Sequence, residues 1–159
     1  YCDSKPFGIA PYEIDHFVPQ KLPNKKISSI APNEYSNLVY SCKSCNRAKS
    51  NKWPTCDEAI YIKNNKGFVD PCNEEYSKHF DRDSNGKISP IDKLGEWMYN
   101  ALKLHKPQHQ VIWTLECIEK NISRIESIIN KNGDTSLYKQ LSILNKSFRE
   151  YLSELSEYA

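Results

Sequence analysis

The sequence predicts an α+β protein in which a small module of two strands and a helix precedes a mostly α-helical region ending in a long helical hairpin. Two short apolar runs, separated by a polar loop and followed directly by a helical segment, indicate the module. Further along, apolar side chains recur every three or four residues, which is typical of amphipathic helices. We expect the module over residues 1–60, a connecting segment over 61–92 and the helical region over 93–159.

Length and composition limit the class of protein. At 159 residues, the chain is long enough for a small module with a helical extension. Its formal net charge of +2 argues against wholesale wrapping of nucleic acid but permits a local basic face. It has no apolar run that could span a membrane and no signal segment, and its first residue is Tyr1 rather than a methionine. We therefore expect a soluble, cytoplasmic protein with no membrane partner, whose start lies upstream of Tyr1.

Residues 12–18 predict the first strand, which Pro19 ends. This strand carries Asp15 and His16, a hard oxygen ligand next to a side chain that can hold or release a proton near neutral pH. Because successive side chains of a strand point to opposite faces, the pair can share a site only if the strand distorts or ends there. Residues 20–36 predict a surface loop, either a solvated linker or one that reaches toward a nucleic-acid backbone.

Residues 37–41 predict the second strand, and residues 42–50 predict a turn that leads into a short helix. This order brings the end of the first strand close to the start of the helix. Basic side chains gather on the helix and just after it, and we expect them to bind nucleic acid. They are Lys43, Arg47, Lys49 and Lys52.

Residues 53–92 give weaker patterns. Asp57 is a candidate N-cap, and the segment 84–86 predicts a polar hairpin turn at Ser-Asn-Gly. The stretch from Asp81 to Asp92 also resembles an EF-hand calcium loop, although Pro90 lies inside it and Asp92 replaces the bidentate Glu. We favour the hairpin turn and keep calcium binding as the alternative.

The last third of the chain predicts helices. Apolar side chains at helical intervals indicate one helix within residues 91–105. Two longer stripes follow, within residues 111–129 and 137–155, separated by a turn at Gly133 with Asp134 as the next N-cap. These stripes predict two antiparallel helices with an ordinary apolar core. Because two helices alone bury such a stripe poorly, the hairpin must lean on other parts of the chain or on another protein.

The cysteines indicate a zinc site. The Cys42-x-x-Cys45 spacing suits thiolate ligation of zinc better than a disulfide, which is rare in cytosolic proteins. Cys2 precedes the first strand by a short connection and is the natural third ligand. The fourth ligand stays open between a residue upstream of the chain, Cys56 and Cys72.

Cys117 lies within the helical tail, where we expect it to be buried as a small apolar side chain. His79, His105 and His109 have no partners at ligand spacing, so we expect them at the surface or at helix caps. None of these four residues enters the predicted metal sites.

Three segments, taken in order, resemble the HNH endonuclease family. They are Glu13-x-Asp15-His16-x-x-Pro19, Asn37-Leu38 and Cys42-x-x-Cys45-Asn46-x-x-Lys49. The family's ββα-metal fold has the same order of elements as the module predicted above. The resemblance implies a metal-dependent endonuclease that hydrolyses the phosphodiester bonds of DNA.

The resemblance also assigns roles by motif position. It makes Asp15 a metal ligand, His16 the general base and Asn37 a residue that orients the site by hydrogen bonding. Asn46 becomes the second metal ligand, in the place of the family's final His. Two oxygen donors favour Mg²⁺ or Mn²⁺ over zinc as the catalytic ion. Neutral His16 would take a proton from water while the ion neutralises charge on the phosphate.

A second resemblance covers the middle of the chain. The motifs Asp70-Pro71-Cys72-Asn73-Glu74-Glu75, His79-Phe80 and Asn85-Gly86-Lys87-Ile88-x-Pro90 are similar to PtuB-type HNH effectors of Septu and retron-associated phage defence. This implies a nuclease regulated by a PtuA-type, ABC/SMC-like ATPase that docks on residues 93–159. Two alternatives stay open: a zinc-stabilised nucleic-acid-binding module without catalysis, and an interaction subunit whose working part is the helical hairpin.

Overall fold

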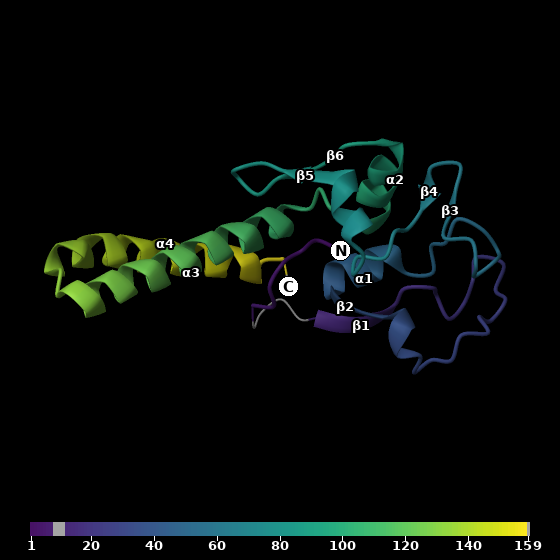
Figure 1. Cartoon of the computed structure of the whole chain (residues 1–159), viewed down its shortest axis with the longest axis horizontal. Helices are drawn as coiled ribbons and strands as arrows, with labels where there is room; N and C mark the ends of the chain where they lie inside the picture. Colours follow the sequence, from purple (N-terminus) through teal and green to yellow (C-terminus); the bar gives the residue numbers. More distant parts are fainter. Residues whose placement is uncertain (8–11, 159) are drawn as a thin grey trace.

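The structure is a computed structural model that describes residues 1–7 and 12–158 (Figure 1). It confirms the predicted α+β class. Its strands form three separate two-stranded sheets, and its two longest helices lie at the end of the chain. Within the described residues, no helix is both long enough and apolar enough to cross a membrane.

The first sheet pairs β1 (Tyr12–His16) with β2 (Leu38–Cys42) in antiparallel register, with Ile14 opposite Tyr40. The helix α1 (Lys43–Lys49) follows β2 directly and packs against both strands. The first strand is two residues shorter than predicted. It ends at His16 because the next amides are taken by Asn37, whose carbonyl accepts from the Phe17 amide and whose side chain accepts from the Val18 amide.

The middle of the chain adds two short hairpins and a 3-10 helix. The strands β3 (Ile62–Lys63) and β4 (Lys66–Gly67) pair with each other, and β5 (Phe80–Arg82) pairs with β6 (Ile88–Pro90). The 3-10 helix η2 (Glu74–His79) precedes β5. Another 3-10 helix, η1 (Tyr35–Asn37), leads into β2.

The predicted hairpin turn is confirmed between β5 and β6. Asp83 Oδ1 accepts hydrogen bonds from the amides of Asn85 and Lys87, 2.9 Å each. Asp92 caps the next helix, since its Oδ1 accepts from the Gly95 amide at 2.6 Å. Two carboxylates that a calcium loop would need are therefore used to hold the backbone, so the structure favours the hairpin over the calcium alternative.

The predicted helices of the last third are also present. They are α2 (Lys93–Leu102), α3 (Pro107–Asn132) and α4 (Tyr138–Ser156). Gly133 ends α3 in the left-handed conformation, with φ +66°. Asp134 caps a short 3-10 helix, η3 (Thr135–Leu137), and α4 begins after it, so the cap serves η3 rather than α4 itself.

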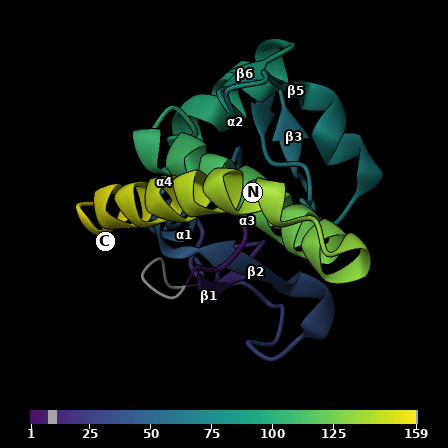
Figure 2. The same ribbon diagram turned by 90° about the vertical axis from the view of Figure 1, so that its left-hand side faces the viewer.

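Two hydrophobic cores hold the chain together. The larger core contains buried side chains from Cys2 to Leu104, so α2 packs with the strands and with α1. The smaller core joins the start of α3 to the end of α4 through Val111, Ile112, Leu115 and Leu155. Figure 1 shows α3 and α4 lying side by side and projecting from the rest of the molecule, and Figure 2 views the same two helices from their far end. We call these two helices the arm and the rest of the molecule the body.

Candidate active site and metal centre

One face of β1 turns toward α1 and carries two carboxylates. Asn46 Nδ2 donates to Glu13 Oε2 at 2.7 Å, and Lys49 Nζ lies 3.2 and 3.1 Å from the two carboxylate oxygens of Asp15. Asp15 is 6% exposed. The alternation of a strand places Glu13 and Asp15 on the same side, and one helical turn of α1 separates their two partners.

Asp15 is held by two donors of different kinds. The Tyr1 hydroxyl donates to its Oδ2 at 2.6 Å, and burial followed by the Asp15 charge raises the pKa of Tyr1 well above its usual value. The Lys49 side chain is fully buried, and its Nζ also donates to the His16 carbonyl at 2.7 Å. Burial lowers the pKa of Lys49, and the Asp15 charge opposes this shift. The carboxylate is thus compensated by an ammonium group and a hydroxyl inside the fold.

His16 has its own set of partners at the end of β1. Its Nε2 lies 2.9 Å from the Pro32 carbonyl and 3.2 Å from the Gln20 side-chain amide. The Pro32 carbonyl can only accept and needs a proton on Nε2, whereas the Gln20 amide nitrogen donates and needs the lone pair of Nε2, so the two contacts require opposite tautomers of the ring. The loop that was predicted as a linker or a nucleic-acid contact therefore supplies two polar contacts to the histidine.

Asn37 fixes the backbone just after His16 by hydrogen bonding. It is 6% exposed, its Oδ1 accepts from the Val18 amide at 2.7 Å, and its Nδ2 donates to the Val18 carbonyl at 3.1 Å. This two-way pairing replaces the next rung of the β1–β2 ladder. The contact agrees with an orienting role for Asn37, which stays a prediction for catalysis.

The structure brings the predicted metal ligands to one interface but gives them separate partners. Asp15 and Asn46 both lie between β1 and α1, yet Asn46 bonds to Glu13 rather than to Asp15. Carboxylate and amide oxygens suit a hard divalent cation, but the Lys49 ammonium contacts both Asp15 oxygens and the Tyr1 hydroxyl donates to one of them, so a cation at Asp15 would have to displace the ammonium. Glu13 carried no role in the sequence prediction, although its spacing of two residues from Asp15 on a strand could have indicated one.

The four basic residues predicted to bind nucleic acid are placed differently from one another. Arg47 and Lys52 are exposed, and Lys43 is half-buried. Lys49 is buried and paired with Asp15, so it does not offer a surface contact. Lys52 Nζ donates to the carbonyl oxygens of Ala48 and Ala101 and so joins α1 to α2.

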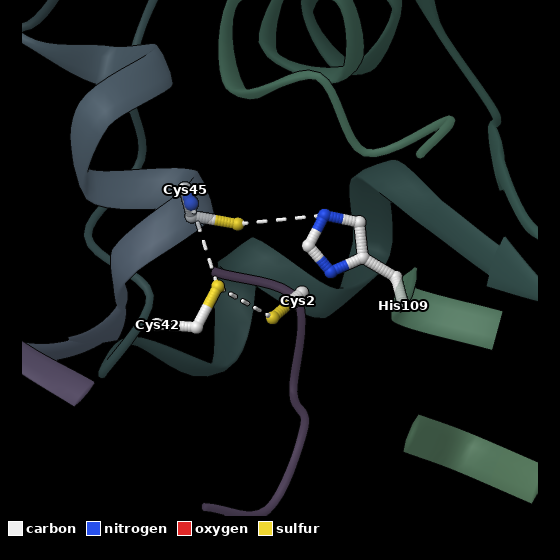
Figure 3. A group of neighbouring side chains, drawn as sticks. All are labelled: Cys2, Cys42, Cys45 and His109. Carbon is white, nitrogen blue, oxygen red and sulfur yellow. Dashed lines mark hydrogen bonds between the residues drawn. The ribbon is translucent and has the colours of Figure 1, made fainter. Parts of the chain in front are cut away.

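A second cluster gathers three thiols and an imidazole, Cys2, Cys42, Cys45 and His109 (Figure 3). Their ligand atoms all lie within 4.8 Å of one another. The Cys2 and Cys42 sulfurs are 3.5 Å apart, and Cys45 Sγ lies 3.9 Å from His109 Nε2. The N-terminal segment, the β2–α1 turn and the first turn of α3 thus meet at one point. The cluster can hold a metal ion, and Cys₃His is a known structural zinc set.

The surroundings of the cluster also fit a metal ion. His109 is 1% exposed, and its Nδ1 has no hydrogen-bond partner among the described residues. A buried imidazole with so few polar contacts is costly unless a ligand compensates it. The hydrogen bond with Cys42 is the main cause that holds the pKa of Cys2 well below its usual value, and the bond with Cys45 adds to it. The same contact with Cys2 raises the pKa of Cys42 to about 11. The cluster therefore favours a negative charge that a cation would neutralise.

The fourth member of this cluster was not predicted. The expectation that His109 is a surface or cap residue is wrong, because it is buried against the cysteines. Cys56 and Cys72, the fourth ligands considered from the sequence, are exposed and lie outside the cluster, and Cys117 is only half-buried. A signal for His109 existed, since it precedes the buried Ile112 by three residues and so continues the apolar face of α3 toward its start.

Comparisons with known proteins agree with this site. Residues 1–52 match the family model of the HNH endonucleases. The chain is also similar to the Septu protein PtuA of Bacillus mycoides (strain KBAB4), with 30% identity over 82 residues, which are 46% of this chain but only 12% of that relative. No solved structure matches.

The family match covers β1, β2, α1 and all residues of the candidate active site. Residues 1–52 therefore form an HNH domain, the class to which metal-dependent nuclease activity belongs. The HNH resemblance seen in the sequence is confirmed for this domain. The Septu relative is named PtuA rather than PtuB, so the PtuB-type assignment stays a prediction.

Proposed function

We propose that this protein is an HNH endonuclease that cuts DNA with one Mg²⁺ or Mn²⁺ ion. The observation that carries the proposal is the gathering of Glu13, Asp15 and Asn46 between β1 and α1, inside the segment that matches the family. Asp15 and Asn46 would hold the ion, with Glu13 beside Asn46. A divalent ion bound there supplies charge neutralisation at the phosphate and at the leaving oxygen.

The proton transfer falls to His16. With a proton on Nε2 that is donated to the Pro32 carbonyl, Nδ1 is the basic nitrogen of the ring. Nδ1 takes a proton from the attacking water as the water oxygen bonds to phosphorus and the bond from phosphorus to the leaving oxygen breaks, and the leaving oxygen then takes a proton from solvent. Asn37 contributes by holding Val18, two residues further on, so that the end of β1 and its histidine keep their orientation.

A plasmid-nicking assay with Mg²⁺, Mn²⁺ or EDTA tests this function. We expect cutting with either ion, no cutting in EDTA, and no cutting by His16→Ala although that variant still binds DNA. Because general-base catalysis contributes about 10²–10⁴-fold, the loss should be of that order. His105→Ala, at an exposed histidine, is the matched control. Cutting in EDTA would reject the metal role of Asp15 and Asn46, and binding without cutting by the unsubstituted chain would favour the non-catalytic alternative.

We also propose that the cluster of Cys2, Cys42, Cys45 and His109 holds a structural Zn²⁺. Thiolate and imidazole ligands in a closed, buried site support zinc over harder cations. Elemental analysis of the purified protein should find one zinc per chain. His109→Ala should lower zinc retention and Cys56→Ala should not, because Cys56 is exposed and apart from the cluster.

Finally, we propose that the protein is the nuclease effector of a bacterial anti-phage complex with an ABC/SMC-like ATPase of the PtuA type. The similarity to a Septu protein supports a defence system. The helical region 93–159 is the proposed docking surface, and its arm carries the exposed apolar side chain of Ile143. Ile143→Glu should weaken copurification with the ATPase, whereas Lys146→Glu, one turn away, should affect it less. Equal retention of the ATPase by both variants would argue against docking on this face of α4.

A further inference from the structure

We propose that a groove between the β3–β4 turn and α2 binds the phosphodiester backbone of the substrate beyond the cleavage site. The inference rests on the proposed nuclease function and extends the nucleic-acid contact from α1 onto a second surface. The groove has a volume of about 610 Å³. Three lysines and three amide side chains line it: Lys52, Lys66, Lys93, Asn64, Asn65 and Asn100.

The groove and the candidate active site are linked through the end of α1. Lys49, the last residue of α1, bonds to Asp15, and Lys52 follows three residues later. Lys52 Nζ donates to Ala101 O at 3.2 Å, which fixes the end of α1 against α2. We infer that a nucleic acid bound at the β1–α1 interface also contacts this surface, since phosphates follow one another along a strand at regular spacing.

The wall formed by β3 and β4 is a constrained turn. Asn64 and Asn65 have φ angles of +53° and +57°, the pair of positive values that a two-residue hairpin turn requires. At Gly67, φ is +134° and a Cβ would collide with the Tyr61 carbonyl oxygen. This tight packing holds Lys66 and the two amides in fixed positions above α2.

The charge in the groove is not compensated. None of its three lysines forms an ion pair with a carboxylate in the part of the chain that the structure describes, and Glu96 is the acidic residue in its lining. Burial lowers the pKa of Lys52, and the nearby charge of Lys103 lowers it further. A chain whose net charge is only +2 thus holds several unpaired cations on one concave surface.

The remaining side chains fit the other parts of a nucleotide. Trp97 also lines the groove, and its ring packs edge-to-face on Phe68 with centroids 4.9 Å apart. Amides can donate to phosphate oxygens and to base edges, and an indole offers a stacking surface. The lysines suit the phosphates, while the amides and the indole suit the base edges and base faces of a nucleic acid, so we commit to nucleic acid as the ligand.

The test measures DNA binding without cleavage. In a His16→Ala background, Lys66→Gln/Lys93→Gln is compared with Lys139→Gln/Lys146→Gln, which removes the same charge from exposed positions of α4. Binding of a short fluorescent DNA duplex is followed over a range of salt concentrations. The logarithm of the binding constant falls linearly with the logarithm of the salt concentration, and each lost phosphate contact should make this slope shallower by about 0.9. The slope of the groove variant should therefore be shallower by about 2, and its binding near 0.1 M salt should be roughly ten- to a hundredfold weaker.

The outcomes separate this inference from the proposed function. With His16 present, the groove variant should need a higher DNA concentration than the α4 variant to reach half of its maximal cutting rate, because the substitutions weaken DNA binding. If the groove variant has the same salt slope and the same affinity as the α4 variant, the groove does not bind DNA, even if His16 proves to be catalytic. Persistent cutting by His16→Ala would instead overturn the proposed mechanism and leave the binding result standing.

Discussion

At the scale of single residues, the most unusual contact is the buried ion pair of Asp15 and Lys49. The Lys49 side chain is 0% exposed and that of Asp15 is 7% exposed. Removing one partner of such a pair leaves a charge in a poorly solvated place, which costs far more than the pair itself contributes. The strand and the helix of the HNH domain therefore depend on each other through this contact.

Lys49→Met should lower the free energy of unfolding by about 3–5 kcal/mol, because it leaves the Asp15 carboxylate without its ammonium partner. Chemical denaturation provides the measurement. Lys146→Met serves as the control, since Lys146 and Glu150 form an ion pair in which both side chains are well exposed, and its loss should cost less than about 1 kcal/mol. Similar losses in the two variants would mean that the buried pair does not hold β1 to α1.

The thiols of the metal centre predict a pH dependence. The hydrogen bond to Cys2 raises the pKa of Cys42 to about 11, and a bond to Cys2 also raises the pKa of Cys45 well above its usual value. Near neutral pH both groups are therefore protonated in the metal-free protein and must release protons when a metal binds. Zinc affinity should rise with pH, by about tenfold per pH unit for each proton released. Competition with a coloured chelator at several pH values measures it, and a flat profile would contradict these protonation states.

At the scale of elements, the β5–β6 turn is fitted to the base of the arm. Gly86 has φ +81°, and a Cβ there would lie 2.8 Å from the Trp113 ring on α3. Gly133 has a similar φ of +66° at the end of α3, but a Cβ there would meet nothing within 4 Å. The two glycines share a backbone conformation and differ in their neighbours. Substituting each by alanine therefore allows the cost of backbone strain to be distinguished from the cost of overpacking.

Gly133→Ala should destabilise the protein by about 1–2 kcal/mol, the cost of a left-handed conformation for a residue with a Cβ. Gly86→Ala should cost about 1–3 kcal/mol more, because its methyl group overpacks against Trp113. Thermal or chemical unfolding of the two variants gives the difference. If the two losses are equal, the β5–β6 turn does not support α3 through this contact.

At the scale of the whole molecule, the metal centre joins parts that the two cores hold separately. Cys2, Cys42 and Cys45 belong to the HNH domain, and His109 belongs to the arm. Lys5 adds contacts near the same place, with its amide 2.7 Å from Glu116 Oε1 on α3. A metal ion bound by all four ligands would fix the direction in which the arm leaves the body.

Removal of the metal with a chelator should therefore increase amide hydrogen exchange in residues 42–49 and in residues 107–115 together. Residues 122–145, toward the far end of the arm, should be unaffected because their helix pairing does not involve the centre. Hydrogen-exchange mass spectrometry measures all three segments. His109→Ala should reproduce the effect at residues 107–115. Faster exchange at residues 42–49 alone would show that the metal stabilises the HNH domain without holding the arm.

The order of the elements and the HNH motif could be predicted from the sequence alone. Strand and helix periodicity predicted β1, β2, α1 and the three long helices, because local side-chain patterns follow backbone geometry. The order of Asp15, His16, Asn37 and Asn46 predicted the HNH domain, and the Cys42-x-x-Cys45 spacing predicted a thiolate site. These features are local in the chain or belong to a motif of fixed order, so they can be predicted without knowledge of the tertiary structure.

Contacts between distant residues could not be predicted from the sequence and follow from the packing of the fold. His109 reaches the cysteines because α3 starts beside the β2–α1 turn, and no spacing in the sequence encodes a contact across 64 residues. Lys49 was predicted as a surface cation, but it lies inward because β1 presents a buried carboxylate to its side of α1. The lysine groove likewise forms from three segments that the sequence separates. Contacts of this kind depend on the packing of elements against one another, which local patterns do not specify.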